Sequence, residues 1–220
     1  MTADFAIEEV DHAIAESIVA RWHYLGTLPK SVLQNFVAKV DGEWVAAACY
    51  GPVHSAKAPA GWLELRRLVK RPDSDIYLSK FLAATLRALK ADGVPAVLSW
   101  ADPDAGHHGG IYQATNWIYT EPYSYNWNSS FRLPDGSIVD HRKAFKLFGT
   151  SSKTKVLGLN PTWQAFLPAP KYRYLMPLCL DKVSCLTALK AKERPYPKPV
   201  IDGARTRVDR RKDFHVVGVS

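Results

Sequence analysis

The sequence has few cysteines and no long apolar run. Its 220 residues include three cysteines, Cys49, Cys179 and Cys185, none of which belongs to a CxxC pair. An odd number of widely spaced cysteines argues against a disulfide framework and a thiolate zinc site, so we expect small buried apolar residues. No apolar stretch approaches the roughly 18 residues of a membrane span, and the acidic start MTADFAIEEVDHAIAE is unlike a signal peptide. We therefore expect no membrane partner.

Several common signatures of enzymes are also absent. The chain contains no GxGxxG or GxxxxGK[ST] phosphate-binding loop, no GxSxG and no HExxH. These absences disfavour the usual nucleotide-binding loops, a standard serine hydrolase and a zincin. The apolar share of 47% and the charged share of 23% are those of an ordinary globular protein.

The net charge of +8 is distributed unevenly along the chain. Residues 1–140 carry 12 Lys and Arg against 16 Asp and Glu, whereas residues 141–220 carry 17 against 5. A strongly basic C-terminal part suggests a polyanionic partner such as nucleic acid. The alternative is a basic surface that only aids solubility.

Periodicity and turn residues predict an α/β fold in the α+β sense, with a central mixed sheet flanked by helices. The sequence Asp41-Gly42 between two β-rich runs predicts a hairpin. A strand, a helix of about 15 residues and a second strand predict parallel neighbours at the sheet centre. We expect strands at residues 5–10, 35–40, 43–50, 62–69, 94–100 and 171–178, a helix from Asp11 to near Gly26, and a helix over 77–91 that Ser79 or Asp75 could cap.

Composition predicts one domain over residues 1–192, the expected place of any catalytic site, and a tail over 193–220. The tail contains PYPKP followed by RTRVDRRKDF, which predicts a poorly ordered basic extension. Residues 119–131 are rich in aromatic side chains, which could stack on bases or pack in a core.

The segment SWADPDAGHHGGIYQATNW, residues 99–117, combines an acid, two imidazoles and a tyrosine among glycines. It follows the predicted central strand, where ligands bind in such sheets. Asp102 or a histidine, His107 or His108, could act as general base or metal ligand, and Tyr112 as general acid. Alternatively, Asp102 begins a turn, a histidine caps a helix and Tyr112 belongs to the core.

Two further groups could carry chemistry. Alternation along a strand places Glu64 and Arg66 on one face and Arg67 on the other, so one arginine points toward the covered side of the sheet. A buried arginine needs an anionic partner, either a ligand phosphate or an internal carboxylate such as Glu64. His23 and Tyr24 stand at the end of the first helix, where a histidine can be a ligand or a packed residue.

The strings RWHYLG, LELRRLV and above all ADP-x-x-GHHG-x-IYQATNW resemble the phage Mom family of DNA-modifying enzymes, and the order of elements resembles the GNAT acyltransferase fold. The resemblance implies conversion of adenine in double-stranded DNA to N6-methylcarbamoyladenine, which protects phage DNA from restriction in the host cytoplasm. It also implies an acetyl-CoA donor and a bound iron. The oligomeric state stays open, a dimer included.

The resemblance implies roles for particular residues. The expected catalytic residues are Asp102, Tyr112, Arg67 or Arg66, His108 and Ser79; Leu68, Arg71 and Ser79 would bind the donor; His23, Tyr24 and Asp102 would hold iron. One departure is that residues 70–79 contain no glycine and two acids, where GNAT enzymes carry a glycine-containing pyrophosphate loop. The alternatives are an N-acetyltransferase acting on a small-molecule or protein amine, and a DNA-binding protein without catalysis.

Overall fold

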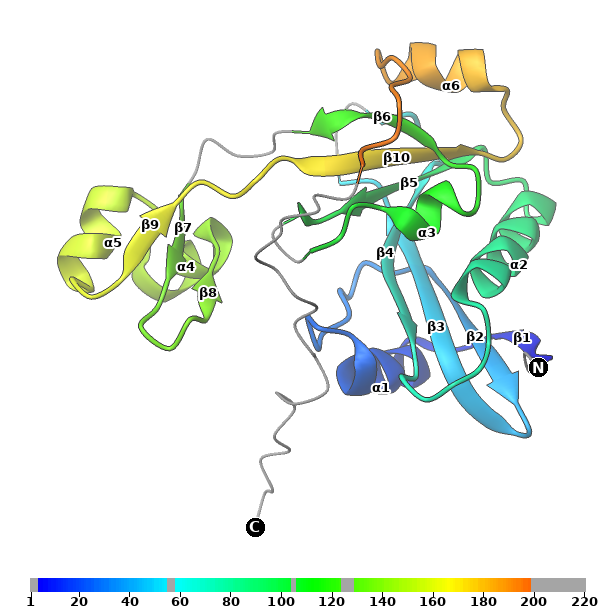
Figure 1. Cartoon of the computed structure of the whole chain (residues 1–220), viewed down its shortest axis with the longest axis horizontal. Helices are drawn as coiled ribbons and strands as arrows, with labels where there is room; N and C mark the ends of the chain where they lie inside the picture. The colour runs from blue at the N-terminus through cyan, green and yellow to red at the C-terminus, as the bar shows by residue number, and fades with distance from the viewer. Residues whose placement is uncertain (1–3, 55–57, 104–105, 124–128, 199–220) are drawn as a thin grey trace.

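The computed structural model describes residues 4–54, 58–103, 106–123 and 129–198. It contains a seven-stranded sheet with the order β1-β2-β3-β4-β5-β10-β6 and a three-stranded sheet with the order β8-β7-β9 (Figure 1). The strands are β1 (Ala6–Glu9), β2 (Gln34–Val40), β3 (Glu43–Pro52), β4 (Leu63–Lys70), β5 (Ala96–Ala101), β6 (Ile118–Tyr123), β7 (Ser130–Arg132), β8 (Ile138–Val139), β9 (Gln164–Phe166) and β10 (Lys171–Pro177). The helices are α1 (His12–Trp22), α2 (Leu78–Ala91), α3 (Gly110–Gln113), α4 (His141–Phe148), α5 (Lys153–Leu159) and α6 (Lys182–Ala188).

The predicted mixed sheet flanked by helices is confirmed. The predicted hairpin joins β2 and β3, and both turn residues, Asp41 and Gly42, have positive φ, as a tight hairpin turn of this kind requires. Strands β4 and β5 are parallel and joined through α2, whereas every other neighbouring pair in the large sheet is antiparallel. Ile18 and Val19 of α1 pack on one face of the sheet, and Phe81 and Leu82 of α2 pack on the other.

Strands β4 and β5 stay together over a short distance only. Their register contains two pairs, Leu63 with Val97 and Glu64 with Leu98. Beyond these pairs β4 continues beside β3, and β5 continues beside β10. The register with β3 also shifts, because Cys49 pairs with Arg67 and Tyr50 pairs with Leu65. Arg66 is therefore the extra residue of a β-bulge, which bends β4 and redirects its side chains.

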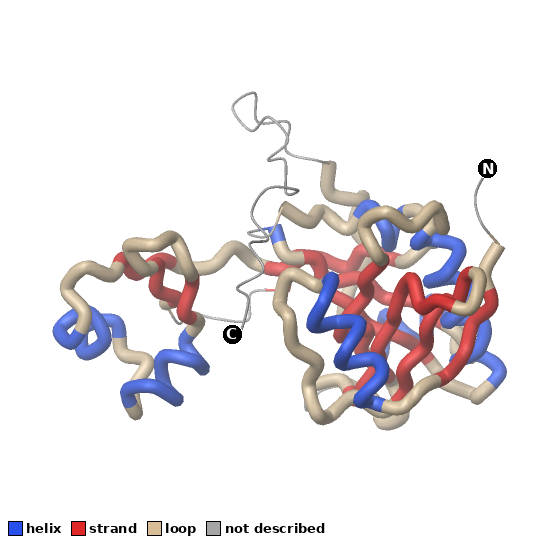
Figure 2. Tube along the Cα trace, turned by 90° about the horizontal axis from the view of Figure 1, so that it is seen from below, coloured by secondary structure: helices blue, strands red, loops and turns tan. Residues whose placement is uncertain are grey.

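The small sheet, together with α4 and α5, forms a unit that we call the lobe, residues 130–166. Figure 2 shows the lobe standing apart from the large sheet, to which the chain returns at β10. Its own core consists of Phe131, Val139, Ala144 and Val156. The sequence predicted no such unit within residues 1–192, because its strands are only two or three residues long and too short to show periodicity.

The predicted tail begins with an attached segment. The backbone N–H of Arg194 donates to the carbonyl oxygen of Tyr119 at 2.8 Å, and the Tyr196 hydroxyl donates to that of Trp117 at 2.7 Å. Residues 193–198 thus lie along β6 and the turn before it, within the stretch predicted as a tail. The rest of the predicted tail, residues 199–220, lies outside the described residues.

Three smaller expectations need correction. The residue preceding α2 is Tyr77, and no side chain caps this helix, so neither Ser79 nor Asp75 has that role. Cys49 and Cys185 are buried as expected, but Cys179 is exposed; all three are free thiols. Among the described residues, none of the helices has the length and apolar character needed to cross a bilayer.

Candidate active site

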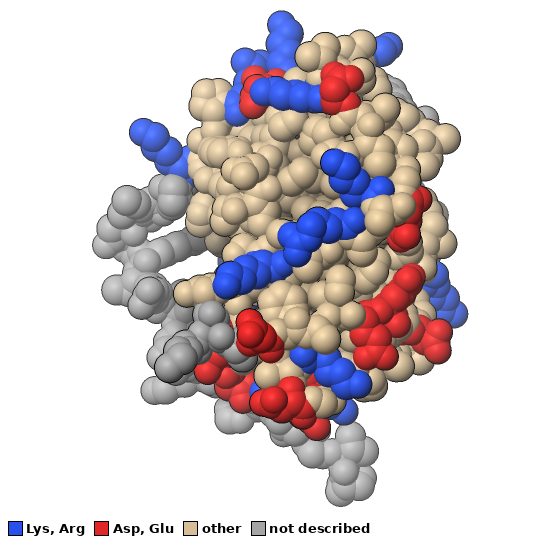
Figure 3. Space-filling model, turned by 90° about the vertical axis from the view of Figure 1, so that its right-hand side faces the viewer, with Lys and Arg blue, Asp and Glu red and all other residues tan. Residues whose placement is uncertain are grey.

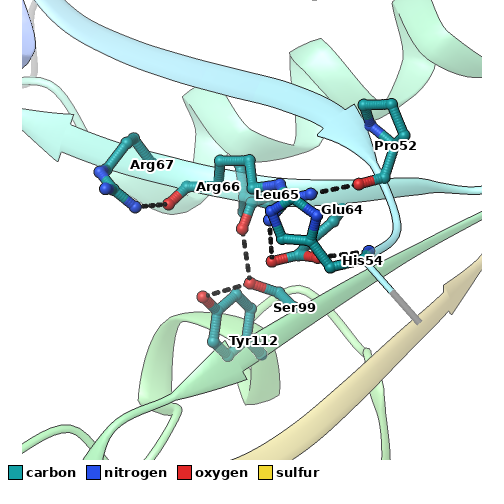
Figure 4. Close-up of polar contacts among 8 residues, drawn as sticks. All are labelled: Pro52, His54, Glu64, Leu65, Arg66, Arg67, Ser99 and Tyr112. Atoms are coloured by element: carbon teal, nitrogen blue, oxygen red, sulfur yellow. Dashed lines mark hydrogen bonds and ion pairs between the residues drawn. The ribbon is translucent and has the colours of Figure 1, made fainter. Parts of the chain in front are cut away.

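A chain of hydrogen bonds marks the point where β4 and β5 separate (Figure 4). The Ser99 hydroxyl on β5 donates to the carbonyl oxygen of Leu65 on β4 at 3.2 Å, and the Tyr112 hydroxyl lies 2.8 Å from Ser99 Oγ. Because Ser99 has a single hydroxyl hydrogen, Tyr112 must be the donor in the second bond. The chain therefore runs from Tyr112 through Ser99 to the backbone of the bulged strand.

Tyr112 is part of the core as well as part of this chain. Its ring packs against those of Trp117, at 5.1 Å, and Tyr174, at 4.8 Å between centroids. Burial raises the pKa of Tyr112 to about 12, although its hydrogen bond with Ser99 counteracts this. The phenol thus keeps its proton at neutral pH.

The loop that leads into α3 is fixed by a close backbone approach. The Tyr174 hydroxyl donates to the carbonyl oxygen of His108 at 2.7 Å. Gly109 has φ +85°, and a Cβ at this position would overlap the Tyr174 ring. The backbone N–H of His107 donates to the carbonyl oxygen of Asp102 at 2.9 Å. Gly109 therefore allows the backbone of this loop to lie against the Tyr174 ring.

Asp102 follows the last residue of β5 and forms an ion pair with Lys171, 2.9 Å between Oδ2 and Nζ. Lys171 is the first residue of β10, which lies antiparallel beside β5. Sequence reasoning predicted a late strand here but did not find Lys171, because the register of distant strands is not visible in a single sequence.

Glu64 and Arg66 form an ion pair on β4, with 3.1 Å between Oε1 and Nη1 (Figure 4). Their side chains are 14% and 5% exposed, so the internal ion pair considered as an alternative for a buried arginine is confirmed for Arg66. Arg66 also donates to the carbonyl oxygen of Pro52, and the His54 N–H lies 3.5 Å from Glu64 Oε2. Burial raises the pKa of Glu64 more than Arg66 lowers it.

Arg67 follows the bulged residue Arg66 and points in a different direction from it (Figure 4). Its Nε donates to the carbonyl oxygen of Thr27 at 2.8 Å, and its Nη1 donates to that of Arg66 at 2.7 Å. A guanidinium has five N–H groups. Arg67 is thus anchored by two of them in an orientation that leaves further donors for an anion.

His23 and Tyr24 lie beside Arg67 and form a small aromatic group with His107. The His23 and Tyr24 rings stack at 4.5 Å with 26° between their planes, and the Tyr24 and His107 rings are 5.5 Å apart. Burial, followed by the charge of Arg67 and by His107, lowers the pKa of His23 to about 4. Since Nδ1 of His23 accepts from the Leu25 N–H at 3.1 Å, the proton of the neutral ring is on Nε2. Tyr24 is 50% exposed.

The predicted donor-binding residues lie further along β4 and at the start of α2. Leu68 packs partly buried against the main core, and Ser79 is in the first turn of α2. Arg71 forms an ion pair with Asp73 at 2.9 Å. The ring of His108 lies beside Gly110, where an added Cβ would come within 3.1 Å of its Nε2.

The expected iron site is not supported. Among the described residues, no group of three or more His, Cys, Asp and Glu side chains lies close enough to hold a metal ion. His23 has one ring nitrogen committed to the Leu25 backbone, and Asp102 is paired with Lys171. This donor set does not fit iron, and we derive no chemistry through a metal.

The aromatic-rich segment 119–131 contributes side chains to two different cores. Tyr119 and Phe131 are buried, the first in the main core and the second in the core of the lobe. The core alternative is therefore correct for these two. Tyr125 and Trp127 lie outside the described residues.

The described residues thus form a mixed sheet that is covered by helices and opened between two parallel strands, with buried charges at the opening. The chain belongs to the Mom protein family, whose family model matches residues 4–198. Membership of this family supports a DNA-modifying or acyltransferase-type role. A search of curated proteins found no match in sequence.

Two solved structures illustrate the similarity in fold. One is the ribosomal-protein-S18-alanine N-acetyltransferase from Escherichia coli, 12% identical, with a TM-score of 0.48 over 81% of this chain and 96% of that one. The other is the IAA acetyltransferase from Bacillus cereus, also 12% identical, with a TM-score of 0.48 over 80% of this chain and 100% of that one. At these values the similarity says nothing about substrate.

Proposed function

We propose that this protein is an enzyme that converts adenine in double-stranded DNA to N6-methylcarbamoyladenine, and that it thereby protects phage DNA from restriction in the host cytoplasm. Membership of the Mom family supports the DNA substrate. The observation that carries the proposal is the grouping of an anchored arginine, Arg67, with the aromatic rings of His23 and Tyr24. Such a group suits a planar base next to a carbonyl oxygen that gains negative charge.

The base would bind on the half-exposed ring of Tyr24. An adenine N6 amine inside a duplex is out of reach of an enclosed site, so the base must leave the stack. Stacking on an aromatic side chain contributes about 1–3 kcal/mol per base. Tyr24 is backed by His23 and flanked by His107, which keeps its ring in a fixed orientation.

The chemistry requires a proton acceptor and groups that stabilise charge on the oxygen. The adenine amine is a poor nucleophile, so it must lose its proton as the new bond forms. Asp102, oriented by Lys171, is the proposed acceptor. Arg67 and the Nε2–H of His23 are the proposed donors to the oxygen. Tyr112 is the proposed proton donor to the leaving group, which requires its hydroxyl to turn away from Ser99.

The start of α2 fits the phosphates of an acetyl-CoA donor. The first turn of this helix contains no acidic residue and no side-chain cap, so its N–H groups can receive an anion. The charge of Asp73, one of the two acids of residues 70–79, is offset by Arg71, which reduces its repulsion of a phosphate. Leu68, Arg71 and Ser79 would hold the donor, which supplies an activated carbonyl carbon when bound. A methylcarbamoyl group contains a nitrogen that acetyl lacks, and forming it from acetyl and an ammonia-level nitrogen removes two electrons. A nitrogen-bearing co-reactant is therefore also required, together with a two-electron oxidant unless that nitrogen is already at the oxidation level of a hydroxylamine.

The proposal is tested by mass spectrometry of nucleosides from plasmid DNA of bacteria that express the protein. The expected result is N6-modified deoxyadenosine with the wild type and with the control Asp92→Asn, and loss of it with Asp102→Asn. Unmodified adenine with a folded wild type would contradict the proposal. If such a protein consumed acetyl-CoA with an amine in the absence of DNA, it would be an N-acetyltransferase. If it bound DNA without any turnover, it would be a DNA-binding protein.

A further inference from the structure

The lobe is packed independently of the catalytic sheet, so its place in the protein needs its own explanation. Its core of four buried residues is supported by Trp163, whose ring lies 6.4 Å from Phe131 and 5.7 Å from Phe148. The helix α4 is capped at its start by Asp140, which accepts from the Lys143 N–H at 2.8 Å. A unit with a complete core of its own presents a surface of fixed shape.

That surface is basic. Residues 130–166 contain six Lys and Arg and only two acids, Asp135 and Asp140. Both carboxylates are occupied by backbone N–H groups of the lobe, those of Ser137 and Lys143. Within the part of the chain that the structure describes, no ion pair joins a carboxylate to Arg142, Lys143 or Lys146. By contrast, the face shown in Figure 3 carries both acidic and basic side chains.

The helix α4, which carries Arg142, Lys143 and Lys146, also exposes large apolar side chains. Phe145 is 60% exposed and Leu147 is 56% exposed, although each stands next to Lys146 in the sequence. The combination of cations and exposed apolar groups matches the surface of a nucleic acid, which offers phosphates and, between them, sugars and base edges.

The chain also leads from the lobe directly into the candidate site. The strand β9 ends at Phe166 and β10 begins at Lys171, whose Nζ lies 2.9 Å from Asp102 Oδ2. A duplex held on the lobe would therefore lie next to the end of the sheet at which β10 begins.

We propose that the outer surface of α4 holds duplex DNA, with Arg142, Lys143 and Lys146 on backbone phosphates and Phe145 against the sugars and bases. This inference rests on the proposed function for the identity of the polyanion, and it assigns the binding of the duplex to the lobe rather than to the catalytic sheet.

The test is the affinity of the full-length protein for a 20-base-pair duplex, measured by fluorescence anisotropy at several salt concentrations. Lys143→Gln/Lys146→Gln is compared with Arg87→Gln/Lys90→Gln on α2, which removes the same charge from another exposed helix face. We expect the lobe variant to bind about tenfold or more weakly and to lower the salt slope by about 2. The control should stay within about twofold of the wild type. Phe145→Ala should weaken binding about tenfold without changing the slope.

The outcomes separate this inference from the proposed function. Equal affinities for wild type, lobe variant and control would overturn the role of α4, even if plasmid adenine were modified. If the lobe variant lost binding to vesicles that contain anionic lipid while its duplex affinity stayed unchanged, the surface of α4 would be assigned to a membrane. That result would also overturn the inference. Loss of duplex affinity only in the lobe variants would support it, even if no modified adenine were found.

Discussion

The large sheet and the lobe differ in how their charged side chains are buried and paired. Near the opening of the sheet, Glu64 and Arg66 are paired and nearly buried, and His23 is kept neutral by its surroundings. On the lobe, Lys143 and Lys146 are exposed, without an ion pair to any carboxylate among the described residues. Buried, oriented charges suit chemistry, because their strength and direction are fixed before a substrate arrives. Exposed cations suit a polyanion, because they are already hydrated and can exchange water and ions for phosphate.

The largest expected effect tests whether the lobe is a separate folding unit. Phe131→Ala removes the largest side chain of its core and should cost about 4 kcal/mol of lobe stability. Hydrogen exchange followed by mass spectrometry should then show loss of protection in residues 130–166 and unchanged protection in β2 to β5. Equal loss in both regions would show that they unfold together.

A slightly smaller effect on stability is expected when Gly109 is replaced by alanine, with the replacement of Gly158 as the comparison. Gly109→Ala introduces a Cβ at φ +85° that overlaps the Tyr174 ring, so it should lower the free energy of unfolding by about 3 kcal/mol. Gly158→Ala on α5 meets open space and should raise lobe stability by about 0.5 kcal/mol. Denaturant titrations of both variants measure the difference. A free energy of unfolding for Gly109→Ala equal to that of the wild type would contradict the close approach of Gly109 to the Tyr174 ring.

The buried ion pair should respond asymmetrically to the loss of either partner. Glu64→Gln leaves a guanidinium that stays charged in a nearly buried position, so it should cost about 2 kcal/mol. Arg66→Met leaves a carboxyl whose pKa burial already raises, so protonation limits the cost to about 1 kcal/mol. Thermal unfolding at pH 7 provides the comparison. A larger cost for Arg66→Met would show that Glu64 depends on Arg66 more than its burial indicates.

The smallest effect concerns the pH dependence of stability. The pKa of His23 falls from 6.5 to about 4 on folding, so the unfolded state binds more protons between these values. Stability should therefore be highest above pH 6.5 and fall as the pH decreases toward about 4. His23→Asn, whose side-chain oxygen can accept from the Leu25 N–H, should reduce this slope. An unchanged slope would indicate that His23 is charged in the folded protein.

The elements of the large sheet could be predicted from the sequence because each is long enough to show its period. The helix predicted at 77–91 is observed at Leu78–Ala91, and the strand predicted at 62–69 is observed at Leu63–Lys70. The bulge at Arg66 was not predictable, since it depends on the register with β3. It shifts the alternation along β4 by one residue, so Leu68 joins Leu65 at the main core, on the face where simple alternation had placed Arg67.

Part of the candidate site was visible in the sequence and part was not. The segment 99–117 provided Asp102 and Tyr112, because an acid and a tyrosine among glycines are unusual after a central strand. Lys171 and Tyr174 were missed, because β10 reaches the site only by inserting between β5 and β6. The alternation of charged and aromatic residues in KYRY, 171–174, is the signal that could have indicated them.

The assignment of the chemistry to the large sheet and of duplex binding to the lobe is tested most directly by one paired measurement. The fraction of modified deoxyadenosine in plasmid DNA is determined by mass spectrometry for wild type and Arg67→Gln, and the duplex affinity of each purified protein is measured alongside. Our account predicts that Arg67→Gln loses modification by about 100-fold or more while its duplex affinity stays within about twofold of the wild type. Modification by Arg67→Gln at the wild-type level, or a loss of duplex affinity as large as that of Lys143→Gln/Lys146→Gln, would contradict it.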